Sequence, residues 1–399
     1  MADDGAERRA EVLRVPSAPD ALELRHLRAF VCVAEELNFS RAANRLFLSQ
    51  PALSRQIRAL ERLIGCDLLR RSTHNVDLTP AGEALLDPAR QILYDLDAAV
   101  GTARAASGEM TAVLAKQWGT ISDLTAADAG LQELRAAYEA LHAQFAPPPE
   151  ITVTPVNAGG VACLRLTPET EPPPTLVYLH GGCYSAGSAF GYRHLAGALA
   201  GAAHTAALVP EYRLAPEHPF PAAVEDATRA YLWILDRGIA PSAVTIAGDS
   251  SGAHLALSML IAARQEQVPM PGRMVFFSPW LDLSCPYPEP GPGDPQPVLT
   301  PGRARRIAAG YLAGHRFDDP VVSPLTADLT GLPAMLVQAG TGDPLREEAR
   351  RLADRASSYG TDVRLDLYPV ETHVFHTFWS FLPEAADALR QAAQYIEGS

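Results

Sequence analysis

The stretch VTIAGDSSGAHLA, residues 244–256, restricts the fold of this chain more than any other part of the sequence. Its β-branched start predicts a short buried strand, and its alanine-rich end predicts a helix. Gly248 and Gly252 stand two residues either side of Ser250 in a G-x-S-x-G pattern. A turn tight enough to join the strand directly to the helix leaves no room for a Cβ at either glycine. The pattern therefore predicts a strained turn that exposes the hydroxyl of Ser250 beside a helix N-terminus, whose free N–H groups favour negative charge.

Strand-like runs recur through the second half of the chain, with helical stretches between them. We expect strands at Ile151–Val156, Val161–Leu166, Thr175–Leu179, Ala206–Val209, Val244–Ala247, Met274–Phe277, Ala334–Gln338 and Val363–Tyr368. The central runs are continuously apolar, which is typical of parallel strands covered by helices on both faces. The sequence therefore predicts an α/β domain over residues 151–399, with a mostly parallel, doubly wound sheet.

Two further strand ends carry the side chains that a nucleophilic Ser250 requires. Asp343 and His373 each follow one of the predicted strands. Residues just beyond the carboxyl ends of parallel strands meet in one crevice, and the order Ser, Asp, His along the chain fits a serine hydrolase of this architecture. We expect His373 to take the proton of Ser250, Asp343 to orient the imidazole, and an acyl-enzyme to form on the serine. His376 is the alternative base.

The strand that ends at Leu179 runs directly into His180, Gly181 and Gly182. The backbone N–H groups of the two glycines can approach a substrate oxygen with no side chain in the way. Together with the N–H of Ser251, at the start of the predicted helix, we expect them to form an oxyanion hole.

Several short motifs then point to a known family. HGGC, EYRLAPEHPFPAAVEDA, GDSSGAHLAL, SPWLDLS, GDPL and HVF occur in this order. Together they resemble the hormone-sensitive-lipase-like group of α/β-hydrolase esterases, and the resemblance covers residues 110–397. It implies an α/β-hydrolase fold, small carboxylic esters as substrates, a helical cap formed by residues 110–150, and neither a metal nor a cofactor.

The chain departs from that family pattern close to the expected pocket. Cys183 stands where the family often has a third glycine, and Ala253 stands where another glycine is usual. We expect Cys183 to narrow or reshape the acyl pocket. Tyr184 and Asp249 are the other expected pocket residues, and for Asp249 the alternative is that it orders the turn around Ser250.

Residues 21–80 differ from the rest of this acidic chain, whose formal net charge is −13, because arginines outnumber acidic residues there. Short helices joined by a tight turn, the later one capped by Ser49, predict an all-α winged helix-turn-helix domain. Gln50 and Arg55 are side-chain types suited to adenine and guanine edges. A small β wing from Leu68 to Leu78 follows. The expected DNA contacts are Ser49, Gln50, Ser54, Arg55, Arg58, Arg70 and Arg71.

The run LRHLRAFVCVAEELNFSRAANRLFLSQPALSRQIRALERLIGCDLLRRS, followed by VDLTPAGEALL, resembles the DNA-binding domain of LysR-type transcriptional regulators. The resemblance covers residues 22–108. It implies DNA binding through residues 24–80 and a long linker helix, residues 80–108, that pairs two subunits into a homodimer. Leu69 replaces a usual aromatic residue of the wing, and His74–Asn75 replaces another basic one. A helical bundle that no longer binds DNA therefore stays an alternative.

Composition excludes other classes. No run of about 18 apolar residues is present, so we expect no membrane span. Residues 1–20 lack the apolar core of a secretory signal and are expected to form a disordered leader. The five cysteines are scattered without a C-x-x-C pair, which argues against a disulfide framework or a zinc site and favours the cytoplasm.

The sequence thus predicts a carboxylesterase-type serine hydrolase fused to a LysR-like DNA-binding domain. The alternative from another class is a transcriptional regulator that uses its hydrolase-fold domain as a small-molecule sensor. In a third interpretation, the DNA-binding part is a vestige of a gene fusion.

Overall fold

The computed structural model describes residues 22–46, 48–71, 76–86, 88–90, 92–93, 96, 110–289, 298 and 300–398. The chain divides into two compact units, Met1–Leu96 and Asp97–Ser399, and each is described by itself. The expected leader at residues 1–20 lies outside the described residues, and so does His74–Asn75 in the wing. Of the expected linker helix, residues 80–86, 88–90, 92–93 and 96 are helical, and the other positions lie outside the described part.

The smaller unit is a helical bundle with a short hairpin. Its elements are α1 (Leu24–Glu36), α2 (Phe39–Arg45), α3 (Gln50–Ile64), β1 (Leu69–Arg71) and β2 (Val76–Leu78), with β1 antiparallel to β2. Helix α3 buries Leu53, Ile57 and Leu60 completely, as expected for apolar residues spaced along one face. Leu69 is also buried in this core, so the residue that replaces the usual wing aromatic serves packing. This confirms the predicted all-α winged domain.

The larger unit is built on one twisted sheet of eight strands, and it confirms the predicted α/β-hydrolase fold. Helices α5 (Met110–Ala126) and α6 (Leu131–His142) precede the sheet. The strands are β3 (Ile151–Ala158), β4 (Val161–Pro168), β5 (Pro174–Leu179), β6 (Ala206–Pro210), β7 (Thr245–Asp249), β8 (Arg273–Phe277), β9 (Ala334–Gly340) and β10 (Val363–Tyr368). Their order is β10-β9-β8-β7-β5-β6-β4-β3, and β4 pairs antiparallel with both β3 and β6 while the other pairs are parallel.

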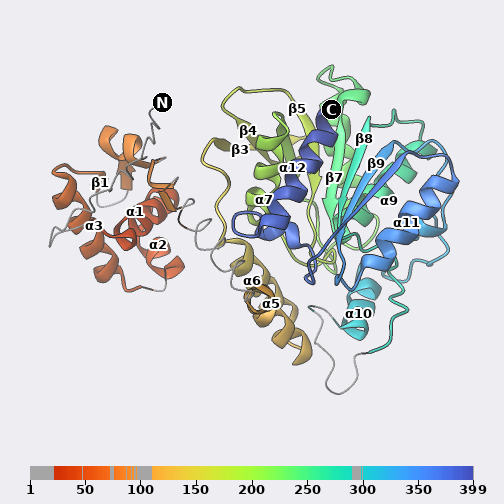
Figure 1. The fold of residues 1–399 in the computed structure, drawn as a ribbon, viewed down its shortest axis with the longest axis horizontal. Helices are drawn as coiled ribbons and strands as arrows, with labels where there is room; N and C mark the ends of the chain where they lie inside the picture. Colours follow the sequence, from red (N-terminus) through yellow and green to blue (C-terminus); the bar gives the residue numbers. More distant parts are fainter. Residues whose placement is uncertain are drawn as a thin grey trace, which may run out of the picture. The chain divides into compact units, whose positions relative to one another are not determined.

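Helices cover both faces of this sheet, as Figure 1 shows. They are α7 (Ala189–Ala202), α8 (Ala222–Leu235), α9 (Ser251–Gln265), α11 (Arg346–Ser358) and α12 (Pro383–Glu397). A further helix, α10 (Pro301–Leu312), lies between β8 and β9 in the chain. Alternate strand residues enter different cores. On β8, Phe276 packs in the cluster that includes α8, α9 and α11, whereas Phe277 packs in the cluster with α7 and α12. Continuous apolar strands are therefore required because both faces are buried.

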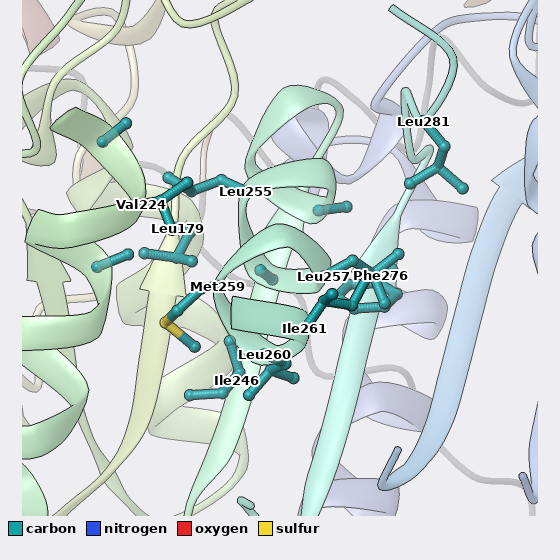
Figure 2. Packing of buried hydrophobic residues seen from close by; sticks show 14 of the residues in the cluster. Leu179, Val224, Ile246, Leu255, Leu257, Met259, Leu260, Ile261, Phe276 and Leu281 are labelled. Carbon is teal, nitrogen blue, oxygen red and sulfur yellow. The ribbon is translucent and has the colours of Figure 1, made fainter. Parts of the chain in front are cut away.

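Helix α9 is the most enclosed of these helices, and Figure 2 shows its contacts. Leu257 and Leu260 are fully buried, and they belong to one cluster with Ile246 of β7 and Phe276 of β8. Truncating one such leucine to alanine costs about 2–5 kcal/mol of stability. This packing fixes the start of α9, and with it the position of Ser250.

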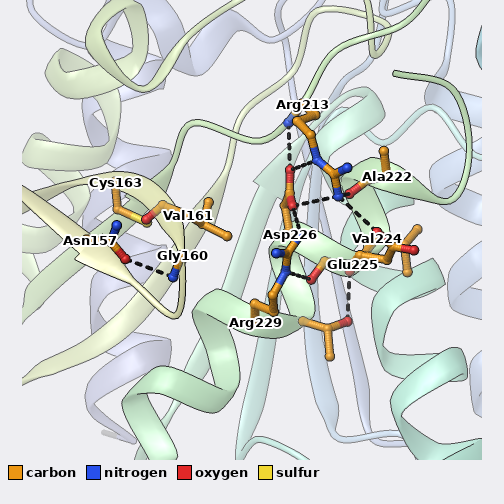
Figure 3. Close-up of polar contacts among 11 residues, drawn as sticks. Asn157, Gly160, Val161, Cys163, Arg213, Ala222, Val224, Glu225, Asp226 and Arg229 are labelled. Carbon is orange, nitrogen blue, oxygen red and sulfur yellow. Dashed lines mark hydrogen bonds and ion pairs between the residues drawn. The ribbon is translucent and has the colours of Figure 1, made fainter. Parts of the chain in front are cut away.

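An ion-pair network orders the loop between β6 and α8 (Figure 3). The backbone N–H and the Nε of Arg213 both lie 2.9 Å from Asp226 Oδ2, and Nη2 lies 2.9 Å from Glu225 Oε2. Arg229 also pairs with Asp226. Asp226 is only 3% exposed, whereas the Arg213 side chain is 38% exposed. The buried carboxylate thus depends on the two arginines, while Arg213 keeps access to water.

Every helix in the described ranges is too short or too polar to cross a membrane.

Candidate active site

Ser250 stands between β7 and α9 in a backbone conformation that few residues adopt. Its φ is 50° and its ψ is −120°. A Cβ on Gly252 would lie 2.0 Å from the carbonyl oxygen of Leu179, and one on Gly248 would lie 2.6 Å from the carbonyl carbon of Gly252. These clashes explain both glycines of the G-x-S-x-G pattern. The strained turn is held by hydrogen bonds from the Ser250 N–H to Phe277 and from the Trp280 N–H to the Ser250 carbonyl.

Asp343 and His373 meet Ser250 from neighbouring loops. His373 Nε2 lies 3.0 Å from Ser250 Oγ. On the other side of the ring, His373 Nδ1 lies 3.1 Å from each carboxylate oxygen of Asp343. The loop after β9 supplies the aspartate and the loop after β10 supplies the histidine, so parallel strand ends bring together residues far apart in the sequence. This geometry suits proton transfer from the serine to an oriented imidazole.

The electrostatics of the pair favour the charged imidazole. Burial lowers the pKa of His373, but the nearby carboxylate of Asp343 outweighs it, so the pKa lies above its ordinary value. For Asp343, burial raises the pKa, and the charge and hydrogen bond of His373 bring it below the usual range. The carboxylate therefore stabilises the positive ring that appears when Ser250 loses its proton.

His376, the alternative base, lies elsewhere. It is fully buried, its Nε2 lies 3.2 Å from Gln338 Oε1, and its ring stacks 4.2 Å from that of Phe277. Burial lowers its pKa to about 3. These contacts pack His376 against β8 and β9, and His373 is the histidine that lies beside Ser250.

The expected oxyanion donors require one correction. The N–H of Gly181 donates to Asp249 Oδ1 at 3.0 Å, so it is not available to a substrate oxygen. Ser251 opens α9, where an N–H has no intrahelical acceptor. Among the described residues, no acceptor takes the N–H of Gly182 or of Cys183. The sequence prediction omitted the Cys183 N–H because it considered only the two glycines as donors in this loop. A backbone N–H can donate whatever side chain its residue carries.

A cavity of about 460 Å³ opens beside Ser250 and His373. Helices α5 and α6 supply one wall, and the loop after β8 together with α10 supplies another. Its lining is mostly apolar: Trp118, Ile121, Thr125, Leu131, Leu134, Tyr138, Gly182, Cys183, Ser185, Ala186, Trp280, Cys285, Tyr287, Pro288, Glu289, Val298, Pro301, Ala304, Ile307, Pro344 and Leu345. The position of α5 and α6 fits the expected cap. Trp118, Ile121 and Thr125 share a helical spacing, which is the signal in the sequence that points to this wall.

Cys183 lines this cavity, but the other two expected pocket residues do not. Tyr184 turns into the core, where its ring stacks 3.7 Å from Tyr311 and its hydroxyl lies 2.6 Å from His254 Nδ1. Cys183 and Tyr184 both have positive φ, 54° and 62°, and this double turn carries the tyrosine away from the cavity.

Asp249 is also absent from the lining and is completely buried. Its carboxylate accepts hydrogen bonds from Tyr178, Tyr192 and the Gly181 N–H, each at 3.0 Å. Burial raises its pKa to about 6, although the two tyrosine hydroxyls and the Gly181 N–H act in the other direction. The geometry therefore favours the alternative role, in which Asp249 orders the loops around Ser250.

In the smaller unit, most of the expected DNA contacts lie on α3 or directly before it. Ser49 caps the helix by accepting from the Ala52 N–H at 3.4 Å. Gln50, Arg55 and Arg58 are exposed, and Ser54 is half-buried. Arg70 on the wing is exposed, and the side chain of Arg71 lies outside the description. An exposed polar and basic helix start is the arrangement that a recognition helix needs.

Comparisons with known proteins agree with this fold. Residues 176–377, about half of the chain, match the alpha/beta hydrolase fold family. The chain belongs to this family. It is 39% identical to an acetyl-hydrolase of Streptomyces hygroscopicus over 66% of this chain and 88% of that protein, and 30% identical to an esterase of Acinetobacter venetianus over 66% and 87%. A crystal structure of an esterase from the bacterial hormone-sensitive lipase family matches with a TM-score of 0.67 and 33% identity, over 71% of this chain and 97% of that one.

Residues 24–83 match the lysR family of bacterial regulatory helix-turn-helix proteins. Both predicted resemblances are therefore confirmed, and so is the predicted enzyme class, an α/β-hydrolase of the esterase type.

Proposed function

We propose that the chain hydrolyses carboxylic esters through a Ser250–His373–Asp343 triad and an acyl-enzyme. The observation that carries this proposal is the continuous contact from Ser250 Oγ to His373 Nε2, at 3.0 Å, and from His373 Nδ1 to the Asp343 carboxylate, at 3.1 Å. The strained conformation of Ser250 supports it, because it holds the hydroxyl beside the cavity.

In the first half of the reaction, Ser250 Oγ attacks the ester carbonyl carbon while His373 Nε2 accepts the serine proton. The negative oxygen of the tetrahedral intermediate accepts hydrogen bonds from the N–H groups of Gly182, Cys183 and Ser251. When the intermediate collapses, the bond to the alcohol oxygen breaks, and His373 returns the proton to the departing alcohol. In the second half, water attacks the acyl-serine with the same proton transfers and releases the carboxylic acid.

The cavity indicates the kind of ester. Its walls are largely apolar, so an uncharged acyl or alkyl group gains from burial there, by about 25 cal/mol per Å². Cys183 lines the same cavity as Ser250 and adds a side chain where a glycine would leave space. Together with the acetyl-hydrolase among the relatives, this supports short acyl groups.

Chromogenic p-nitrophenyl esters of increasing acyl length test the proposal. We expect turnover by the wild type, and a loss of about 10⁴-fold or more in kcat for Ser250→Ala. A fluorophosphonate should add covalently to Ser250, located by peptide mass. Ser242→Ala, which removes an exposed hydroxyl just before β7, is the matched control and should keep full activity. A wild type that neither turns over esters nor takes up the label contradicts the proposal.

We further propose that the smaller unit binds DNA in a sequence-specific manner. We propose that the chain does so as a homodimer, and that it operates in the cytoplasm. The exposed Gln50 and Arg55 at the start of α3, together with the lysR-family match of residues 24–83, favour this second function. A regulator that senses a small molecule in its hydrolase-fold domain stays the alternative, and it predicts ester binding without turnover.

Footprinting on the DNA upstream of the gene tests this second function. We expect a protected, partly palindromic site whose affinity falls as salt rises. Gln50→Ala combined with Arg55→Ala should lose the site, whereas Ser250→Ala should keep it. Equal, sequence-blind binding by the wild type and the double variant would contradict it, and light scattering reports whether the chain is dimeric.

A further inference from the structure

Tyr192 of α7 lies at the centre of a buried hydrogen-bond chain that the mechanism above does not use. It is 1% exposed. Its hydroxyl lies 2.7 Å from the hydroxyl of Tyr138 and donates to Asp249 Oδ2 at 3.0 Å. Tyr138 belongs to α6 and lines the cavity. These hydrogen bonds therefore connect a wall of the cavity, at Tyr138, to Asp249, the residue that precedes Ser250.

Asp249 continues this chain into the oxyanion loop, residues 180–183. Its Oδ1 accepts the N–H of Gly181 at 3.0 Å. The contact is tight, because a Cβ on Gly181 would lie 2.3 Å from Asp249 Oδ2. Gly181 directly precedes Gly182 and Cys183, whose N–H groups are the proposed oxyanion donors. The carboxylate therefore holds the peptide unit between His180 and Gly181, which directly precedes the two units that carry those donors.

A stack of rings runs along the same path. The ring of His142, on α6, lies 4.4 Å from that of Tyr192, and the ring of His180 lies 5.4 Å from that of Tyr192. His180 in turn stacks 4.2 Å from Tyr212, and the Tyr212 hydroxyl donates to the His180 carbonyl at 2.7 Å. Helix α6 thus contacts the oxyanion loop through both hydrogen bonds and packing, with Tyr192 in both.

We propose that Tyr138, Tyr192 and Asp249 are positioning residues, through which α6 sets the geometry of the oxyanion loop. The inference rests on the proposed function. An oxyanion exists only in the tetrahedral intermediate and the transition states around it, so a misplaced loop lowers kcat and leaves substrate binding nearly unchanged. The loss is smaller than that of deleting a donor, because the N–H groups stay present but move.

Tyr138→Phe and Tyr192→Phe test this, since each removes one hydroxyl and keeps the ring. We expect kcat to fall about tenfold in each, less than the 10²–10³-fold loss of a donor, with KM within about twofold of wild type. The affinity for a trifluoromethyl ketone, which forms a tetrahedral oxyanion on Ser250, should fall in proportion to kcat. The control is Tyr231→Phe, which removes a buried hydroxyl bonded to the Pro269 carbonyl and should keep wild-type kcat and inhibition.

The effects of the two Phe substitutions on kcat should not add, because Tyr138 acts on the oxyanion loop through Tyr192. Because Tyr138 reaches the loop through Tyr192, the double variant Tyr138→Phe/Tyr192→Phe should have the kcat of Tyr192→Phe alone. Asp249→Asn keeps the shape of the side chain but replaces one acceptor oxygen by a donor, and we expect a larger fall in kcat. If Asp249→Asn fails to fold, the kcat of Tyr138→Phe still tests the proposal. The Tyr138 hydroxyl lies at the edge of the network, so we expect its loss to leave folding intact.

The proposal is overturned if both Phe variants match Tyr231→Phe in kcat and ketone affinity, or if they change only KM or melting temperature. A purely structural role predicts that last result. An active wild type with unaffected Phe variants defeats this inference alone, whereas a wild type without turnover or phosphonate labelling defeats the proposed function and this inference with it.

Discussion

His373 lies between a hydroxyl and a carboxylate, and its pKa decides the pH at which it can act as a base. The imidazole must be neutral to accept the proton of Ser250, and Asp343 raises its pKa above the ordinary value. We therefore expect kcat/KM to rise with pH through a pKa above about 6.5, and to level off on the alkaline side.

Asp343→Asn should move that rise to lower pH, because the variant removes the main charge that opposes the lowering of the His373 pKa by burial. The same variant should reduce kcat by about 10³–10⁴-fold through loss of imidazole orientation. A pH profile of both proteins checks this, and an unchanged midpoint in the variant would exclude Asp343 as the partner of His373.

Two glycines offer a contrast that isolates the tight turn. A Cβ on Gly252 would meet the Leu179 carbonyl oxygen at 2.0 Å, whereas one on Gly119, in α5, would meet nothing within 4 Å. We expect Gly252→Ala to lose at least about 3 kcal/mol of stability, and Gly119→Ala to gain about 0.5–1 kcal/mol from helix propensity. Urea unfolding measures both, and equal effects would show that the turn tolerates a side chain.

At the residue scale, sequence reasoning singled out Ser250, Asp343 and His373 because each follows a recognisable strand, and the structure brings the three side chains together. It misplaced Tyr184, since nothing in the pattern reveals two consecutive residues with positive φ. It also assigned the Gly181 N–H to the substrate, because the competing acceptor, Asp249, belongs to a different strand. Contacts between side chains and distant backbone require the fold itself.

At the scale of elements, the loop between β6 and α8 shows how burial decides the worth of an ion pair. Arg213 touches both Asp226, which is buried, and Glu225, whose side chain is 55% exposed. Arg213→Met leaves a buried carboxylate with one partner fewer, so we expect a loss of about 3 kcal/mol. Glu225→Gln removes an exposed charge and should cost less than about 1 kcal/mol. Thermal unfolding of the two variants checks the order, and a larger effect for Glu225→Gln would contradict it.

The strands were predictable as elements, because burial on both faces demands continuous apolar runs, and each expected run became a strand. The wall formed by α5 and α6 was less accessible to such reasoning. Trp118 and Ile121 belong to a buried hydrophobic cluster and also line the cavity, so their apolar spacing has the same appearance as that of any amphipathic helix.

At the scale of the whole molecule, each unit has a hydrophobic core of its own. Among the described residues, the core of the smaller unit is formed by residues within 27–93, and the clusters around the sheet are formed by residues from 114 onward. We therefore expect calorimetry of the full chain to resolve separate unfolding transitions for the two units. Labelling Ser250 with a fluorophosphonate should shift only the transition of the larger unit. A single cooperative transition that moves as a whole would contradict this.

The hydrogen bond between the Gly181 N–H and Asp249 also restricts how the substrate range of this protein can be changed by mutation. The loop that surrounds the reacting oxygen and the strand that carries the nucleophile share one carboxylate, so neither can be redesigned alone. A mutant library that varies Cys183 to admit bulkier groups should hold positions 181 and 249 constant or vary them as a pair. A library that varies the two positions independently would contain mostly proteins whose active site is misassembled, and few with a new specificity.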